Sequence, residues 1–464
     1  MAASPRTGLS SAYQTVHRMQ LHQLGNRLQG KWVWLLLLAS CGTQQQVQKI
    51  AHRQLASAEA FDKSHWGVSV LDLTSNTYWY NQNGHKYFVP ASNTKIPTCY
   101  AAMKHLGERL PAALVRETAD TLYVQPQGDP SFLHPDFLVQ PLWQKMLTSK
   151  KHVVLRYAVR DRFDAYGSGW SWDDYQEPYL AERSAFPLYG NLVQFEVRDQ
   201  QLKATPSLAL RFPFIKEPMI QLLGSGGNFS ISRSQDENLF SISRGGRSFT
   251  KTTIPYKTNR GVTNFIFLQD TLQKMGLSAS VSLDGNPLQG QLLFSQPTDS
   301  LLIPLMHRSD NFFAEQSLLM VSQRLLGYMS DRKLIDTLLA TDLKGLPQTP
   351  RWVDGSGLSR YNLFTPQDMV TILARMRQEF SWSRIQAIFP HGNEGTLSGY
   401  YVADSTAIYA KTGTLSGVVA LSGFLQTRKG KWLAFSVMVN NHQSSATAVR
   451  RQIEKFLSAI RARY

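Results

Sequence analysis

Cysteine is nearly absent from this chain, since Cys41 and Cys99 are the only two in 464 residues. Cys41 ends a leader-like segment, so the sequence excludes a framework of structural disulfides. Cys99 is expected to be a small buried residue, because free cysteines usually behave as apolar side chains. A hydrophobic content of 42%, with 11% aromatic residues, is typical of a folded globular protein rather than a disordered one.

Acidic residues are absent from the first 40 positions, which hold four basic ones. The apolar run at residues 32–39 is too short to span a bilayer and is typical of the hydrophobic part of a signal peptide. Residues 38–41 (Leu-Ala-Ser-Cys) are similar to a lipobox, in which Cys41 is lipidated and becomes the new N-terminus. We therefore expect a signal peptide over residues 1–40. The alternative is a buried apolar segment followed by a chance cysteine.

This leader has two candidate start sites, Met1 and Met19, because the basic stretch before the apolar run is long. The polar residues 42–48 are expected to form a tether. Two acyl chains bury enough methylene groups for stable anchoring. We therefore expect an extracytoplasmic, periplasmic protein that is lipid-anchored to a bacterial membrane.

Signatures of nucleic-acid binding are also missing, although the formal net charge is +16, or +12 without the basic residues of the leader. No zinc-finger, helix-turn-helix or RNP-like pattern accompanies this charge, so no nucleic-acid partner is expected. The charge suits a surface that faces anionic lipid or cell-wall polymer. A length of 464 residues indicates two or three domains.

Residues 92–95 (Ser-Asn-Thr-Lys) carry the first pattern that suggests chemistry. The residues after them predict a helix that Gly107 stops, and side chains three apart lie on one helix face, so Lys95 can reach the Ser92 hydroxyl. Pro97 lacks an N–H donor, so we expect the helix to bend there or to begin later, with the kink accommodated. The alternative is that Ser92 is only an N-cap. The same spacing occurs where we expect surface residues without function, at Ser248 with Lys251 and Ser330 with Lys333.

Two other motifs occur once each and favour a catalytic interpretation. Ser309 and Asn311 form a Ser-x-Asn pair, and residues 411–414 are Lys-Thr-Gly-Thr. With Ser92 and Lys95 they supply a nucleophile, an amine, a polar proton path and a cationic anchor for a carboxylate. These are the parts of an acyl-transfer site that uses lysine as its base.

The surroundings of Lys411 predict a strand, because small and apolar residues follow it as far as residue 425. Gly413 has no side chain and would let another backbone approach closely. The alternative is an edge strand with one solvated lysine.

Period-two alternation predicts strands at both ends of the chain, over residues 67–73, 78–80, 415–426 and 432–440. We expect them to form one antiparallel sheet. Helices are predicted over residues 49–62 and at the C-terminus, where Ser444 or Ser445 is the cap and the apolar positions are Val449, Ile453, Phe456 and Ile460.

The middle of the chain, residues 114–296, contains short strand-like runs separated by Gly, Pro, Asn and Ser. It shows no long amphipathic helix and no internal repeat. We expect a β-rich insertion of one or two domains, flanked by the two parts of a catalytic domain, residues 49–113 and 297–464. Such insertions are tolerated when their ends lie close together.

From about Phe61 to its C-terminus the sequence resembles the D-Ala-D-Ala carboxypeptidase/endopeptidase family of low-molecular-mass class C penicillin-binding proteins. The three motifs above belong to the wider penicillin-recognising superfamily. Four further segments resemble this family in particular: residues 128–131 (Gly-Asp-Pro-Ser), 170–174 (Trp-Ser-Trp-Asp-Asp), 354–360 (Asp-Gly-Ser-Gly-Leu-Ser-Arg) and 394–397 (Glu-Gly-Thr-Leu).

The resemblance implies an α+β fold with a transpeptidase/β-lactamase-like domain, an antiparallel sheet flanked by helices, interrupted by the insertion. It implies that Ser92 attacks the carbonyl between the last two D-alanines of a peptidoglycan stem peptide, with neutral Lys95 as base. Burial and the neighbouring cation Lys411 would both lower the lysine pKa. Water would hydrolyse the acyl-enzyme, and a β-lactam would be trapped at the same serine.

The remaining roles follow from the same resemblance. Ser309 would pass a proton to the leaving amine, and Asn311 would hold the substrate amide. Lys411, with Thr412 and Thr414, would bind the terminal carboxylate. The backbone N–H groups of Ser92 and Thr414 would form the oxyanion hole, and Gly413 belongs to the same substrate-binding set.

The resemblance also places an inserted-region aspartate near the site, facing an amino group of the stem peptide. We assign it to Asp174, with Asp173 as the fallback and a solvated loop aspartate as the alternative. Arg360 is a further candidate for the pocket. No cofactor and no metal are expected.

Two other functions stay open at this point. A β-lactamase needs a base for rapid deacylation, and the nearest candidate, Glu177, lacks the asparagine of the usual loop and lies inside the insertion. A non-turning-over penicillin-binding or cell-wall-sensing module would carry the same motifs without catalysis.

Overall fold

The computed structural model describes residues 42–198, 201–215, 229–244 and 251–464. The predicted signal peptide, Cys41 and Ser248 lie outside the described residues.

The segment that follows Cys41 is helical, so the tether predicted over residues 42–48 is wrong. Residues 42–51 form a helix that continues into η1 (His52–Ala56). Val47, Ala51 and Leu55 are fully buried. Their spacing of four places them on one helix face. Because the rest of the stretch is polar, the packing of this one face stabilises the helix.

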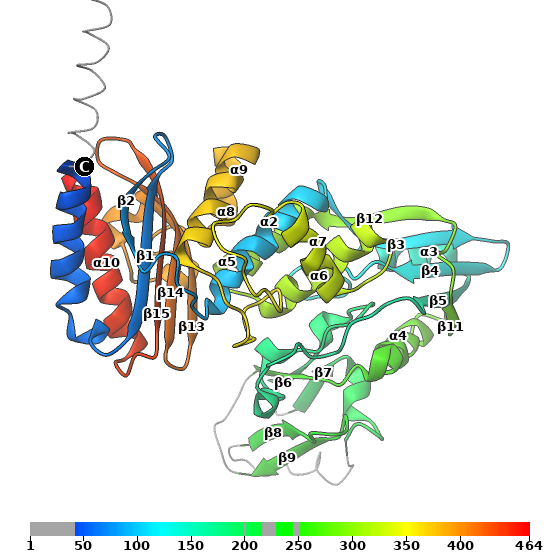
Figure 1. Ribbon diagram of the computed structural model, residues 1–464. Helices are drawn as coiled ribbons and strands as arrows, with labels where there is room; N and C mark the ends of the chain where they lie inside the picture. The colour runs from blue at the N-terminus through cyan, green and yellow to red at the C-terminus, as the bar shows by residue number, and fades with distance from the viewer. Residues whose placement is uncertain (1–41, 199–200, 216–228, 245–250) are drawn as a thin grey trace, which may run out of the picture.

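The first sheet has the order β13-β14-β15-β1-β2, and all its neighbouring strands are antiparallel. It confirms the prediction that both chain ends share one sheet (Figure 1). The strands are β1 (His65–Asp72), β2 (Thr77–Gln82), β13 (Ile408–Leu415), β14 (Val418–Gln426) and β15 (Trp432–Asn440). The run predicted as one strand from residue 415 is therefore preceded by a separate strand that holds the Lys-Thr-Gly motif.

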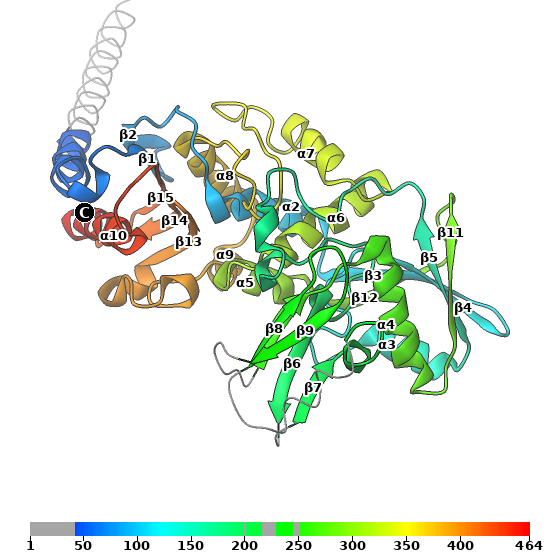
Figure 2. The same ribbon diagram turned by 90° about the horizontal axis from the view of Figure 1, so that it is seen from below.

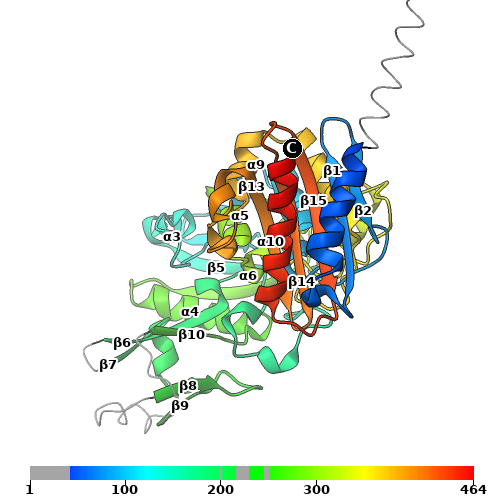
Figure 3. The ribbon, with the colours of Figure 1, turned by 90° about the vertical axis from the view of Figure 1, so that its left-hand side faces the viewer.

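The two faces of this sheet are buried in different cores, as the period-two alternation of a strand requires. Leu433, Phe435 and Val437 of β15 pack under the N-terminal helix and α10 (Ala446–Arg463), whereas Ala434 and Met438 face the central helices. Figure 3 shows α10 and the N-terminal helix lying together across the outer face. The four predicted apolar positions of α10 are fully buried, and Ser445 caps its first turn.

The inner face is covered by helices that carry two of the motifs. They are α2 (Lys95–His105), α5 (Thr298–His307), α6 (Asn311–Leu326), α7 (Asp331–Ala340), α8 (Pro366–Glu379) and α9 (Trp382–Ile388). Cys99 is fully buried in their core, as predicted. Within the described residues, no helix combines the length and the hydropathy of a membrane span.

The inserted region lies beyond these helices, on their far side from the first sheet (Figures 1 and 2). One mixed sheet has the order β11-β5-β4-β3-β12, in which β11–β5 and β5–β4 are parallel and the other pairs are antiparallel. Its strands are β3 (Arg109–Glu117), β4 (Thr121–Pro126), β5 (His152–Ala158), β11 (Ala279–Asp284) and β12 (Gln291–Pro297). The boundaries predicted at residues 114 and 296 therefore fall inside paired strands.

Two smaller antiparallel sheets complete this region. They consist of β6 (Leu192–Arg198), β7 (Gln201–Thr205) and β10 (Lys251–Pro255), and of β8 (Phe229–Arg233) and β9 (Phe240–Arg244). Helices α3 (Pro141–Ser149) and α4 (Val262–Gln273) lie among these sheets. The region is rich in strands, as predicted, but its core also includes both helices.

Candidate active site

Ser92 lies on a 3₁₀ turn, η3 (Ala91–Thr94), which leads directly into α2. The turn and the helix bring the Lys95 Nζ to 3.1 Å from the Ser92 Oγ. Pro97 occupies the first turn of α2, where an α-helix does not need its N–H. The predicted kink is therefore accommodated at a position that tolerates proline.

The Lys95 amine is completely buried and has two further contacts. It donates hydrogen bonds to the Asn311 side-chain oxygen and to the Ser356 carbonyl, both at 2.6 Å. Burial lowers the pKa of Lys95 to about 8, although nearby Asp354, Glu315 and Asp310 oppose that change. Burial, one of the two effects expected from the sequence, therefore moves the amine toward the neutral form that a base requires.

The second motif sits where α5 gives way to α6. Ser309 has a φ of +61°, a left-handed conformation that few residues other than glycine adopt. Asp310 caps α6 by accepting a hydrogen bond from the Phe313 N–H at 3.0 Å. Asn311 then begins the helix, and its Nδ2 donates to the Tyr179 carbonyl of the inserted region at 3.1 Å. Asn311 thus joins Lys95 to the inserted region.

The third motif lies on β13, beside the turn that carries Ser92. A Cβ added to Gly413 would come within 2.7 Å of the Pro90 carbonyl and 3.1 Å of the Ser92 nitrogen. The close approach predicted for Gly413 is thereby confirmed. The Asn93 side chain closes the contact by donating to the Lys411 carbonyl at 2.8 Å.

Lys411 is completely buried on β13, so the alternative of a solvated lysine is wrong. Its Nζ donates to the Thr412 carbonyl at 2.8 Å. Burial lowers its pKa well below the ordinary value, and Lys95 and Arg450 act in the same direction. Arg450 of α10 also donates a hydrogen bond to the Thr414 hydroxyl.

A fourth segment, residues 354–359, completes the site and was not assigned a structural role from the sequence. Gly357 has a φ of +85°, and a Cβ added there would lie 1.9 Å from the Ala91 carbonyl. The Asp354 carboxylate accepts hydrogen bonds from the Gly357 and Ser359 N–H groups at 2.8 and 2.7 Å. This segment therefore packs directly on the Ser92 turn.

These segments surround a cavity of about 700 Å³. Its walls include Ser92, Ser309, Asn311 and Thr414, which come from all three motifs. Asp174 and Tyr179 of the inserted region line the same cavity, together with Gly169 and Ser171, and so does Arg360. The roles expected of Asp174 and Arg360 stay predictions. Tyr179 has a pKa raised to about 12 by burial and by the Asp174 carboxylate.

The other Ser-x-x-Lys pair in the described residues has a structural role. The Ser330 side chain accepts a hydrogen bond from the Lys333 N–H as the N-cap of α7. Among residues 42–198, 201–215, 229–244 and 251–464, no group of three acidic, His or Cys side chains could hold a metal ion.

The fold and the cavity together define a penicillin-recognising serine hydrolase with an interrupted catalytic domain. A profile of the D-Ala-D-Ala carboxypeptidase 3 (S13) family matches residues 46–460, and the chain belongs to that family. It is accordingly a serine-type D-Ala-D-Ala carboxypeptidase by class.

Three individual similarities agree with this assignment. The chain is 24% identical over 426 residues to the D-alanyl-D-alanine carboxypeptidase DacB of Haemophilus influenzae, covering 82% of this chain and 86% of that relative. It is 27% identical over 436 residues to a D-alanyl-D-alanine carboxypeptidase of Actinomadura sp., covering 82% and 78%. The crystal structure of penicillin binding protein 4 (dacB) from Haemophilus influenzae shares the fold, with a TM-score of 0.67, 22% identity and coverage of 89% and 98%.

Proposed function

We propose that Ser92 is the nucleophile of a DD-peptidase and that Lys95 is its general base. The observation that carries this proposal is the contact of a buried amine with the serine hydroxyl at 3.1 Å. An amine with a pKa of about 8 is largely protonated at neutral pH but readily loses its proton, which suits a base that accepts the serine proton. Attack on the carbonyl between two D-alanines forms a Ser92 ester and releases D-alanine. Water then cleaves the ester.

Residues that line the same cavity would stabilise the leaving amine and the oxyanion. Ser309 faces the cavity and would deliver a proton to the leaving nitrogen, while Asn311 would hold the substrate amide. The backbone N–H groups of Ser92 and Thr414 would stabilise the oxyanion, because fixed donors aimed at developing charge lower the barrier.

The terminal carboxylate would bind at the third motif. Thr414 lies on the cavity wall, and the Arg450 guanidinium donates to its hydroxyl, while Lys411 is buried on the same strand. Thr412 is the next residue of β13, but it is buried and does not line this cavity, so its role in carboxylate binding stays a prediction. The Arg450 guanidinium makes this part of the strand attractive to a carboxylate.

Asp174 is proposed as the acceptor for an amino group on the stem peptide. It is half-buried at the cavity, whereas Asp173 is exposed and accepts a hydrogen bond from the Ser171 hydroxyl. An Asp174→Asn variant should lose about tenfold in kcat/KM for a stem peptide with a free side-chain amine. It should be unchanged for the acetylated peptide.

The enzyme would work on peptidoglycan stem peptides outside the cytoplasm and be acylated by β-lactams. We further propose that Cys41 carries the lipid anchor. Metabolic labelling with a fatty-acid analogue should mark the wild-type chain but not a Cys41→Ser variant. Labelling of both would refute the anchor and leave the catalytic assignment untouched.

A fluorescent penicillin tests the catalytic assignment. The intact protein should become covalently labelled and the Ser92→Ala variant should not. Labelling of that variant, or no labelling of the wild type, would refute the assignment. Release of D-alanine from a pentapeptide, compared with cleavage of a cross-linked dimer, then separates carboxypeptidase from endopeptidase activity. Glu177, the residue considered as a β-lactamase base, is exposed and does not line the cavity, so stable acylation rather than rapid turnover of penicillin is expected.

A further inference from the structure

The Ser356 carbonyl is one of the three groups that contact the Lys95 amine. Its position depends on the neighbouring peptide group, because the Ser356 N–H donates to the Glu315 carboxylate at 2.7 Å. Glu315 lies on α6, one turn after Asn311, whose side chain also contacts Lys95. Helix α6 therefore positions the Lys95 amine in two ways. Asn311 contacts the amine directly, and Glu315 acts through the Ser356 peptide group.

Glu315 is an unusual residue for this purpose, because its side chain is only 1% exposed. A buried carboxylate is costly unless it is paired. Its cationic partner is Arg183, whose Nη1 lies 3.3 Å from the Glu315 Oε2 and 2.6 Å from the Asp331 carboxylate. Arg183 belongs to the inserted region, and its side chain is 2% exposed.

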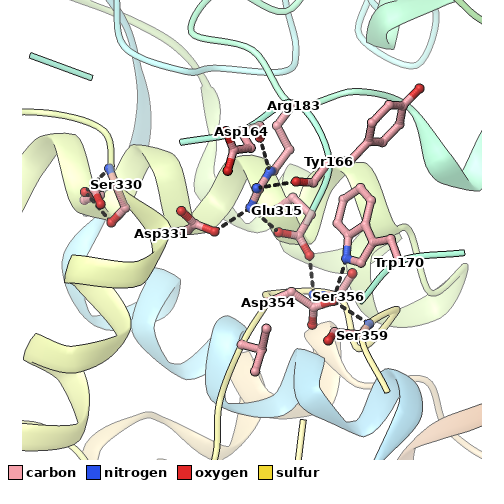
Figure 4. Close-up of polar contacts among 12 residues, drawn as sticks. Asp164, Tyr166, Trp170, Arg183, Glu315, Ser330, Asp331, Asp354, Ser356 and Ser359 are labelled. Carbon is pink, nitrogen blue, oxygen red and sulfur yellow. Dashed lines mark hydrogen bonds and ion pairs between the residues drawn. The ribbon is translucent and has the colours of Figure 1, made fainter. Parts of the chain in front are cut away.

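The remaining nitrogen atoms of Arg183 also have partners. Nε donates to the Asp164 carbonyl at 3.0 Å and Nη2 to the Tyr166 carbonyl at 3.3 Å. The guanidinium thus ties a loop of the inserted region to α6. Figure 4 shows it between Asp331 and Glu315, with Glu315 pointing toward Ser356.

The same loop makes a second contact with the segment that carries Ser356. The Trp170 indole donates to the Asp354 carboxylate at 2.8 Å, and the Arg183 guanidinium lies over the Trp170 ring at 5.5 Å. Arg183 and Trp170 therefore reach both acidic groups that hold residues 354–359 in place.

The groups around Glu315 act on its pKa in opposite directions. Burial, and then the Asp354 carboxylate, raise the pKa of Glu315 to about 7, while Arg183 lowers it and Asp331 raises it. The charged groups that face Lys95 are Asp354, Glu315 and Asp310, and Lys411 lies close enough to sense the Lys95 charge. Removing the Glu315 charge should therefore lower the pKa of the Lys95 amine.

We propose that Glu315, held by Arg183 of the inserted region, is a positioning residue that orients the Ser356 carbonyl against the Lys95 amine. Arg183 acts through Glu315 and does not line the cavity that contains Ser92. The inserted region then contributes to the geometry of the base as well as to the walls of the cavity. This proposal rests on the proposed role of Lys95, but its tests compare variants that all retain Ser92 and Lys95.

The first test compares two substitutions at Glu315 by the rate of acylation with a fluorescent penicillin from pH 6 to 10. Glu315→Gln keeps an oxygen that can accept from the Ser356 N–H but loses the charge. The rise of its acylation rate with pH should shift to lower pH by roughly half a unit or more. The maximal rate at high pH should change less than about threefold. Glu315→Leu loses the acceptor, so its plateau should fall by about 10- to 100-fold, since misplacement by about 1 Å has that effect.

The second test asks whether Arg183 acts through Glu315. Arg183→Met leaves a buried carboxylate unpaired and should lower the acylation rate by tenfold or more, with partial rescue by Arg183→Lys. The Arg183→Met/Glu315→Gln double variant lacks the Glu315 carboxylate, and the Asp331 carboxylate that also loses Arg183 is less deeply buried, with its side chain 14% exposed. Its rate should therefore lie near that of Glu315→Gln alone. Multiplication of the two single losses would overturn the proposal, because independent sites combine additively in free energy.

A matched control separates positioning from general stability. Arg461 of α10 forms an ion pair with Asp404 at 2.7 Å, and its side chain is 20% exposed. Arg461→Met should lower the melting temperature without changing the acylation rate. If Glu315→Gln and Glu315→Leu both kept the wild-type pH midpoint and plateau and differed from the wild type only in melting temperature, Glu315 would be structural and the proposal would fail. If no variant or wild type were acylated, the proposed function itself would fail instead.

Discussion

The Lys95 amine touches the Ser92 hydroxyl from within the protein core, at 3.1 Å and with no exposed surface of its own. This relationship combines two requirements of a serine acyl-transfer enzyme. The amine is close enough to accept the proton, and burial lowers its pKa enough for the neutral form to be accessible.

The pH dependence of acylation should report Lys95. With a pKa of about 8, the rate of labelling by a fluorescent penicillin should rise about tenfold per pH unit below pH 8 and level off above it. Lys95→Met should lower the plateau by about 10²- to 10⁴-fold, the usual contribution of a general base. A profile that is flat between pH 6 and 9 would contradict the assignment of Lys95 as the base.

The same burial predicts a stability effect with a definite sign. Below pH 8 the amine is charged in both the folded and the unfolded chain, so the cost of burying that charge is complete. Above the ordinary value of 10.5 it is neutral in both. The stabilising effect of Lys95→Met should thus be larger at pH 7 than at pH 10.5 by about 3 kcal/mol. Chemical denaturation at several pH values measures it, and an effect that grows with pH would contradict the prediction.

Gly357 should tolerate no side chain, because the missing Cβ makes room for the Ser92 turn. Gly357→Ala places a methyl group 1.9 Å from the Ala91 carbonyl, so acylation should fall by about 10²-fold or more. Gly430 is the matched control, since its φ of +80° is similar and nothing lies within 4 Å of its added Cβ. Gly430→Ala should cost about 1–2 kcal/mol of stability from backbone strain and leave acylation unchanged. Equal acylation by both variants would show that the contact with Ala91 is unimportant.

Arg450 should strengthen binding of the substrate carboxylate through Thr414. Arg450→Ala should raise KM for a pentapeptide by about tenfold, equivalent to about 1.4 kcal/mol. Acylation by a penicillin ester, which lacks the free carboxylate, should change much less. Its neighbour Arg451 contacts Glu454 at 2.6 Å, so Arg451→Ala carries the same charge change as a control and should leave KM unaltered. An equal rise in KM for both variants would point to net charge alone.

Much of the site could be predicted because its first parts are local in sequence. The spacing of Ser92 and Lys95 matches one helical turn, and the apolar periods of β14, β15 and α10 identify the sheet and its covering helix. The prediction of a tether over residues 42–48 failed for a physical reason. The helix at residues 42–51 has a polar composition, and only its packing against the sheet and α10 stabilises it.

Sequence alone thus determined the chemistry of this protein: a serine, a lysine three residues later, a Ser-x-Asn pair and a Lys-Thr-Gly strand. Tertiary structure decided how that chemistry is tuned. The Ser356 carbonyl lies 261 positions from Lys95 and Glu315 lies 132 positions from Arg183, so no local pattern could pair them. Only folding removes the amine from water and surrounds it with these partners, and desolvation is a property of the folded environment rather than of any residue.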